Sequence, residues 1–264
     1  MENAVEMLYN KEALIVQANE LVRSKQDELT LLEAKLIRLA ISQILIEDTD
    51  LKTYSCKVTE LARFLDMPLT NIYTALGTLT SSLMRKVIRM VDKTTKPKIS
   101  GEYNYKLFHW VDYCEYGNGT ITIKLSESLK PYLLGLNALF TEYGYNSILA
   151  LPTNNSIRLL ELLKSYQNVT HPNFSYESPY AEIEKDGNEL VFSIDYLKEY
   201  FNCVGKYSNN GDFIIKVISA SVNTINTNST SKIVFRTAKK GRSITHVLFK
   251  MDAWEDGNFR KSLL

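Results

Sequence analysis

Residues 58–84 read VTELARFLDMPLTNIYTALGTLTSSLM, and this stretch decides the fold. A first helix, which Thr59 is placed to cap, is predicted to stop before Pro68, because proline lacks an amide donor and disfavours helix at the preceding residue. A second helix is predicted over about residues 70–84, since Ile72 and three leucines fall on one apolar stripe. Helix, tight break and helix form the helix-turn-helix pattern.

The flanking sequence extends this pattern into a larger unit. Thr30 and Glu33 have capping-box spacing at the start of an amphipathic helix over residues 30–43. Three stretches after residue 84 are rich in β-branched and aromatic residues and are predicted as strands, namely 86–91, 105–113 and 120–125. Helices followed by a basic β-hairpin are typical of a winged helix.

The second half repeats the same order of elements. An amphipathic helix follows Thr153, and the mostly polar stretch 168–187 is predicted as a surface loop. A helix that Ser193 can cap, a turn, a longer helix and two β-runs come next, over 193–201, 204–210, 211–226, 232–237 and 243–251. The periodicity shows this repetition, and residue identity does not. The sequence therefore predicts an α+β fold of two tandem winged-helix domains, residues 1–135 and 136–264.

Length and charge bound the class of protein. The 264 residues exceed one average domain, and a net charge of only +1 argues against coating nucleic acid by bulk charge. The cations are instead concentrated in two zones with few acids, residues 85–106 and 201–250. One basic zone in each half favours a localised interaction with an anionic partner such as nucleic acid.

The cysteines and the apolar runs bear on the compartment. Cys56, Cys114 and Cys203 are far apart and lack the close spacing of zinc ligands, so they are interpreted as reduced thiols. The sequence contains neither a signal-peptide pattern nor a run of roughly 18 uncharged apolar residues. We expect a cytoplasmic protein that does not associate with membranes.

Catalytic patterns are poor throughout the sequence. It has no phosphate-binding glycine loop, no nucleophile elbow and no close histidine pair, and His109, His171 and His246 are isolated. DNA nicking by tyrosine beside a histidine-bound metal is disfavoured for the same reason. We therefore predict no enzyme activity, no catalytic residue, no metal site and no cofactor.

Candidate DNA-binding residues of the second half cluster in two places. Duplex recognition needs a helix that fits the major groove, polar side chains that read base edges, and cations that hold phosphates. The entry to the longer helix supplies Lys206, Tyr207, Ser208, Asn209, Asn210 and Lys216, and the hairpin tip supplies Lys239, Lys240 and Arg242. The alternatives are a solvated loop with a helix cap, and lysines that protect a sheet edge.

The first half offers a weaker version of the same arrangement. The candidates at the start of its second helix and just after it are Thr70, Asn71, Tyr73, Thr74, Arg85 and Lys86. A polar exposed helix or a dimer contact explains this set equally well. Lys93, Lys96 and Lys98 lie in the expected hairpin, where they either touch phosphates or belong to an ordinary solvated loop.

Several runs resemble a known family. The opening VQANELV at 16–22, followed by LTLLEAK at 29–35, is similar to the start of plasmid replication initiators that bind iterons and begin theta replication. The second-half residues Tyr207, Phe213, Lys240-Gly241-Arg242 and Phe249 resemble that family's carboxy-terminal winged helix. The resemblance implies that domain 136–264 docks on directly repeated sites, while domain 1–135 contributes dimerisation and auxiliary DNA contact.

The resemblance also implies partners and a mechanism. Dimers would repress their own promoter, while monomers in equilibrium with them open an AT-rich region and recruit host helicase and initiator proteins. The first hypothesis is accordingly a plasmid replication initiator that binds double-stranded DNA. The alternatives are a winged-helix transcriptional repressor without a replication role, and a module that binds protein partners instead of DNA.

Overall fold

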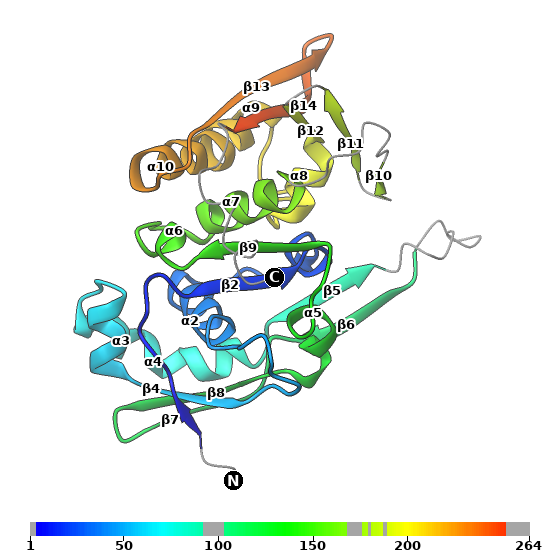
Figure 1. Ribbon diagram of the computed structural model, residues 1–264. Coiled ribbons are helices and arrows are strands. Elements are labelled where there is room, and N and C mark those ends of the chain that lie inside the picture. Colours follow the sequence, from blue (N-terminus) through cyan, green and yellow to red (C-terminus); the bar gives the residue numbers. More distant parts are fainter. Residues whose placement is uncertain (1–3, 92–102, 168–175, 179–180, 187–188, 252–264) are drawn as a thin grey trace. The chain divides into compact units, whose positions relative to one another are not determined.

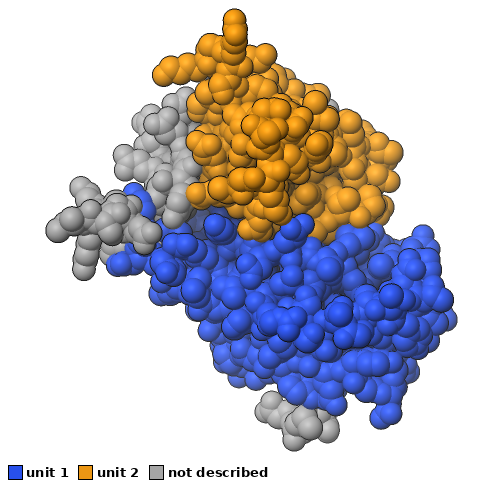
Figure 2. All heavy atoms as spheres, turned by 180° about the vertical axis from the view of Figure 1, so that it is seen from behind, with its two compact units in different colours: residues 1–149 blue, residues 150–264 orange. Residues whose placement is uncertain are grey.

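The computed structural model describes residues 4–91, 103–167, 176–178, 181–186 and 189–251 (Figure 1). For residues 167, 176–178 and 181–186 it describes the backbone alone. The chain forms two compact units, Met1–Leu149 and Ala150–Leu264, which Figure 2 draws in separate colours. The sequence pattern places the domain boundary after residue 135, whereas the two units divide after residue 149. β9 (Phe140–Gly144) pairs with β2 (Leu14–Ala18), and Tyr145 donates its hydroxyl proton to the Lys35 carbonyl at 2.8 Å, so residues 140–145 belong to the first unit.

The first unit contains a helical core and three small sheets. Its helices are α1 (Asn19–Val22), α2 (Leu31–Ile41), α3 (Val58–Phe64), α4 (Leu69–Leu83), η1 (Glu127–Leu129), α5 (Lys130–Leu133) and α6 (Asn146–Leu149). Its strands are β1 (Val5–Glu6), β2 (Leu14–Ala18), β3 (Lys25–Gln26), β4 (Thr53–Lys57), β5 (Val87–Val91), β6 (Tyr105–His109), β7 (Val111–Gly117), β8 (Thr120–Leu125) and β9 (Phe140–Gly144). The sheets run in the orders β1-β4-β8-β7, β2-β9 and β3-β5-β6.

Helix α2 is the centre of this core. The Thr30 hydroxyl accepts a hydrogen bond from the Glu33 amide at 3.2 Å, and the Glu33 carboxylate accepts one from the Thr30 amide at 2.8 Å, which confirms the capping box. Every residue from 32 to 41 is buried. The Lys35 ammonium group donates a hydrogen bond to the Leu149 carbonyl at 2.7 Å. Burial lowers the pKa of this group.

The helix-turn-helix is present as α3 and α4. Asp66 has a φ of 50° and Pro68 precedes α4, so the predicted break is confirmed. The apolar stripe of α4 is also confirmed, because Ile72, Leu76, Leu79 and Leu83 are all buried. The expected cap is wrong: α3 begins at Val58, one residue before Thr59, and has no side-chain cap.

The strands of the first unit follow the sequence pattern with one correction. The stretch 105–113, predicted as one strand, is divided between β6 and β7, which belong to different sheets. Trp110 lies between them in the sequence, and its side chain is fully buried. The chain therefore passes from one sheet to the other at a residue whose side chain packs in the core. β5 and β6 pair antiparallel, and Lys93, Lys96 and Lys98, which come between them in the sequence, lie outside the described residues.

The second unit is a winged helix with an enlarged sheet. Its helices are α7 (Asn154–Gln167), α8 (Ile194–Tyr200), α9 (Asn210–Phe213), η2 (Ile214–Ser219) and α10 (Ala220–Asn228). Its strands are β10 (Tyr176–Ser178), β11 (Ala181–Asp186), β12 (Glu189–Ser193), β13 (Ile233–Lys240) and β14 (Ser243–Met251), in the antiparallel order β10-β11-β12-β14-β13. The prediction of a loop over 168–187 is therefore wrong, because β10 and β11 extend the sheet.

Aromatic packing holds this sheet to its helices. Phe192 of β12 meets Phe249 of β14 edge to face, with ring centroids 5.9 Å apart, and both rings are buried with Phe213. The predicted cap of α8 is confirmed by the bond from the Tyr196 amide to the Ser193 hydroxyl at 3.2 Å. The β13–β14 hairpin extends beyond the helices of its unit (Figure 1). None of the described helices is long and apolar enough to cross a membrane.

Candidate nucleic-acid interface

The three segments α9, η2 and α10 form one unbroken helix from Asn210 to Asn228, here called the recognition helix. Its buried positions recur every four residues, in the rows Phe213, Val217, Ser221, Ile225 and Ile214, Ile218, Val222. In an α-helix such rows drift by about 40° at each step, because a turn takes 3.6 residues. The π segment η2 has a wider turn, and this turn keeps both rows directed into the core.

The opposite face of the recognition helix carries two further rows with the same spacing. They consist of exposed or half-exposed residues, Ile215, Ser219, Asn223, Thr227 and Lys216, Ala220, Thr224, Asn228. Thr224 and Thr227 each donate a hydroxyl proton to the carbonyl four residues earlier at 2.8 Å, so their oxygens stay available as acceptors. This face is narrow, mostly uncharged and polar, which suits the base edges of a major groove.

Most of this surface goes beyond the set predicted from sequence, which included Lys216 alone. The missed residues are Ile215, Ser219, Ala220, Asn223, Thr224, Thr227 and Asn228. Their signal in the sequence is the four-residue repeat of apolar positions on the buried side, which fixes the rows that face outward.

The asparagines that begin the recognition helix have structural roles. The Asn209 side-chain oxygen accepts the Asp212 amide proton at 2.8 Å and caps the helix. Asn210 accepts a hydrogen bond from the Lys198 ammonium group at 2.7 Å and donates one to the Ile244 carbonyl at 2.7 Å. Asn210 therefore fixes the start of the helix to α8 and to β14. Whether either asparagine also contacts a base stays a prediction.

The remaining predicted residues near this helix start lie around Tyr207. Its ring lies 6.0 Å from that of Phe213, and the Lys216 ammonium nitrogen is 5.9 Å from its centroid. This cation–π contact holds Lys216 beside the first turn and leaves it exposed. Lys206 and Ser208 are exposed in the preceding turn. The structure thus brings together the residues that the sequence places at this helix entry.

The hairpin tip presents a cluster of cations. Lys239, Lys240 and Arg242 are exposed, and no ion pair joins them to the described part of the chain. Gly241 has a φ of 62°, a left-handed conformation that glycine adopts without steric cost. These three residues are called the wing cations below.

Arg236, further down the same strand, behaves differently from the wing cations. It donates two hydrogen bonds to the Glu189 carboxylate on β12, at 3.1 and 2.6 Å. The bonds from Arg236 lower the pKa of Glu189 below its usual range. Arg236 therefore supports the base of the hairpin, while the wing cations are left for another anion.

The corresponding helix of the first unit, α4, differs from the recognition helix in charge. α4 contains no charged residue, and Thr70, Asn71, Tyr73 and Thr74 lie exposed on its outer face. The Thr74 hydroxyl donates to the Thr70 carbonyl at 2.8 Å. Arg85 is exposed just beyond the helix end. The predicted residues are thus close together, but α4 itself supplies no cation for a phosphate.

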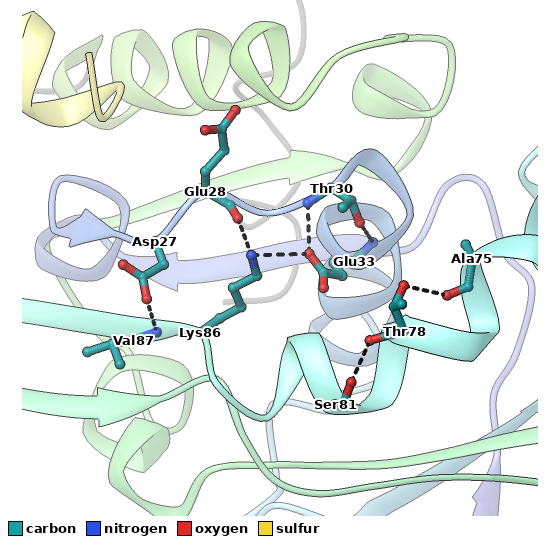
Figure 3. A network of polar contacts seen from close by, with 9 residues as sticks. All are labelled: Asp27, Glu28, Thr30, Glu33, Ala75, Thr78, Ser81, Lys86 and Val87. Carbon is teal, nitrogen blue, oxygen red and sulfur yellow. Dashed lines mark hydrogen bonds and ion pairs between the residues drawn. The ribbon is translucent and has the colours of Figure 1, made fainter. Parts of the chain in front are cut away.

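Lys86 is held by the protein itself (Figure 3). Its ammonium group donates to the Glu28 carbonyl at 2.6 Å and lies 4.0 Å from the carboxylate of Glu33, whose side chain is only 1% exposed. Glu33 thereby links the cap of α2 to the start of β5. This network gives Lys86 a structural role, and its predicted contact with DNA is untested.

A second basic surface follows the β3-β5-β6 sheet. Lys25 pairs in register with Arg89, whose guanidinium carbon lies 3.8 Å from the centroid of the Tyr105 ring. Exposed Lys106 follows Tyr105 on β6 and pairs in register with Met90, so it lies on the other face of this sheet. Lys25 and Tyr105 were missed by the sequence analysis. Lys25 becomes a neighbour of Arg89 only when β3 pairs with β5, and Tyr105 only when β6 does.

Groups that could support catalysis or bind a metal are sparse. In the described ranges, no three His, Cys, Asp or Glu side chains gather as metal ligands. His109 is exposed on β6, His246 is half-buried on β14, and His171 lies outside the described residues. Burial raises the pKa of the Cys56 thiol to about 12 and that of Cys114 to about 11, so both are protonated near neutrality.

Comparison with known proteins gives two family matches. Residues 14–164 match the model described as Initiator Replication protein, WH1, and residues 193–251 match Initiator Rep protein, WH2. A crystal structure of Pi initiator protein in complex with iteron DNA is similar to this chain, with a TM-score of 0.63 and 17% identity. The similarity covers 94% of this chain and 100% of that one. The predicted fold of two tandem winged-helix domains is confirmed.

Proposed function

The chain belongs to the initiator replication protein family, and on this premise we propose that it binds directly repeated origin sequences, or iterons, in duplex DNA and starts plasmid replication there. The observation that carries the proposal is the second unit's pairing of an outward polar helix face with exposed wing cations. Its structural relative, Pi initiator protein, was crystallised with iteron DNA. The protein acts as a DNA binder and remodeller in the cytoplasm, without enzyme activity.

The second unit supplies the principal contact in this proposal. The recognition helix lies in a major groove, where Asn223 and the hydroxyl-bearing residues of its outer rows form hydrogen bonds with base edges. The wing cations neutralise phosphates, which contributes affinity on any sequence. Because Asn210 bonds to the Ile244 carbonyl, the start of the helix and the hairpin approach DNA in a fixed relation.

The first unit supplies an auxiliary contact or a subunit contact. α4 has an uncharged outer face, so it adds little phosphate attraction and suits either shallow base contact or pairing with a second copy. Lys25 and Arg89, on one face of the β3-β5-β6 sheet, provide cations for this contact. We propose that a homodimer in equilibrium with the monomer uses this unit, that the dimer represses its own promoter, and that the monomer recruits host helicase and initiator proteins.

Plasmid maintenance tests the replication role. A circular DNA carrying only this gene, the direct repeats beside it and a selectable marker is introduced into the host from which the gene comes. We expect it to be inherited, and expect a triple alanine variant of the wing cations to abolish inheritance at normal protein level. If the wild-type gene does not sustain the circle yet lowers expression from its own promoter, the protein is a transcriptional repressor.

A further inference from the structure

The outer face of the recognition helix contains one large apolar side chain. Ile215 is 66% exposed, whereas its neighbour Ile214 is 8% exposed and packs in the core. Six of the other seven residues in the two outward rows are Ser, Thr, Asn or Lys, and the seventh is Ala220. A single exposed isoleucine is ordinary on a protein surface, so its position must carry the argument.

Three features of the helix define that position. Ile215 lies in the first two turns, the part of a recognition helix that contacts base edges in helix-turn-helix proteins. It starts the row that continues through Ser219 to Asn223. The π turn also bonds the Ala220 amide to the Ile215 carbonyl, which places a small side chain one turn further along the same face.

We infer that Ile215 reads the C5 methyl group of a thymine in the recognised repeat, an inference that rests on the proposed function. The thymine methyl is the one apolar group in the major-groove pattern of base pairs, and apolar side chains recognise it. Ala220 leaves room for the helix backbone to approach the base beside it. Lys216, held beside Tyr207, then faces the phosphates that flank this base.

The geometry also explains why isoleucine is tolerated in water at this point. In free protein the side chain stays mostly hydrated, and association buries it against the methyl group. Burying one methyl group is worth about 0.8 kcal/mol, which corresponds to about a fourfold change in affinity. The contact is therefore a moderate specificity determinant that adds to the polar contacts of the same face.

Thymine-to-uracil substitution tests this contact. The full-length protein is titrated with a duplex carrying the direct repeats beside its own gene, and with duplexes in which each thymine in turn is replaced by deoxyuridine, which lacks only the methyl group. We expect one position at which uracil weakens wild-type binding about fourfold. I215A should bind the unmodified duplex about fourfold more weakly and should be insensitive to uracil at that position.

V234A is the matched control, because Val234 is 63% exposed on β13 of the same unit and outside the recognition helix. It should retain the wild-type profile, and unfolding curves should show that all three proteins are folded. If I215A binds as tightly as wild type, or keeps full uracil sensitivity at every position, the contact does not exist. If wild type fails to distinguish the repeats from a scrambled duplex, the proposed function fails first.

Discussion

The wing cations give a prediction whose size follows from the structure. Replacing Lys239, Lys240 and Arg242 together with alanine removes three exposed cations that have no ion pair within the described residues. Each phosphate contact contributes about 0.9 to the slope of log affinity against log salt, so the slope should become shallower by about 2.7. Between 50 and 200 mM salt, wild type should lose about 40-fold more affinity than the variant.

The assay is fluorescence anisotropy of a labelled duplex at five salt concentrations. The control removes three cations of the first unit that already pair with carboxylates, namely Lys52 with Asp48 at 2.5 Å, Lys57 with Glu60 at 3.6 Å and Lys130 with Asp50 at 2.7 Å. Both variants change the net charge equally, and only the wing variant should change the slope. Equal slopes in the two variants, whether changed or unchanged, would refute the assignment of phosphate contact to the wing.

The remaining predictions concern the supports of the interface. N210A should lower the free energy of unfolding by about 2 kcal/mol in urea titrations, because it removes the bonds to Lys198 and Ile244; relaxed specificity at unchanged stability would instead indicate base contact. K86A should cost about 1–2 kcal/mol, since the buried Glu33 carboxylate loses a cation; a change below 0.5 kcal/mol contradicts this. Native Cys56, with a pKa of about 12, should resist iodoacetamide at pH 8 and react once unfolded; rapid labelling in the native state contradicts its burial.

Features that depend on neighbouring residues could be predicted from the sequence. The Thr30 capping box, the break at Pro68 and the helix-turn-helix of the first half all follow from patterns a few residues long. The position of the wing also follows, because Gly241 between cations favours a tight turn. These patterns were sufficient to predict both winged helices and the region of the candidate interface.

Features that depend on distant partners could not be predicted. Lys86 and Asn210 look like free DNA-binding residues in the sequence, yet they bond to residues 58 and 34 positions away. The same limit applies to β10 and β11, whose polar sequence becomes strand by pairing with each other and with β12. The outward rows of the recognition helix were missed because the sequence analysis took its candidates from the helix entry and did not follow the opposite face along the helix.

The most direct test of the central claim is binding of the full-length protein to duplex fragments from around its own gene, titrated against salt with a scrambled competitor. We predict tight binding to fragments with direct repeats that survives excess competitor, together with protection of each repeat from nuclease cleavage. Weak binding that is equal for all sequences and vanishes at moderate salt would contradict the account.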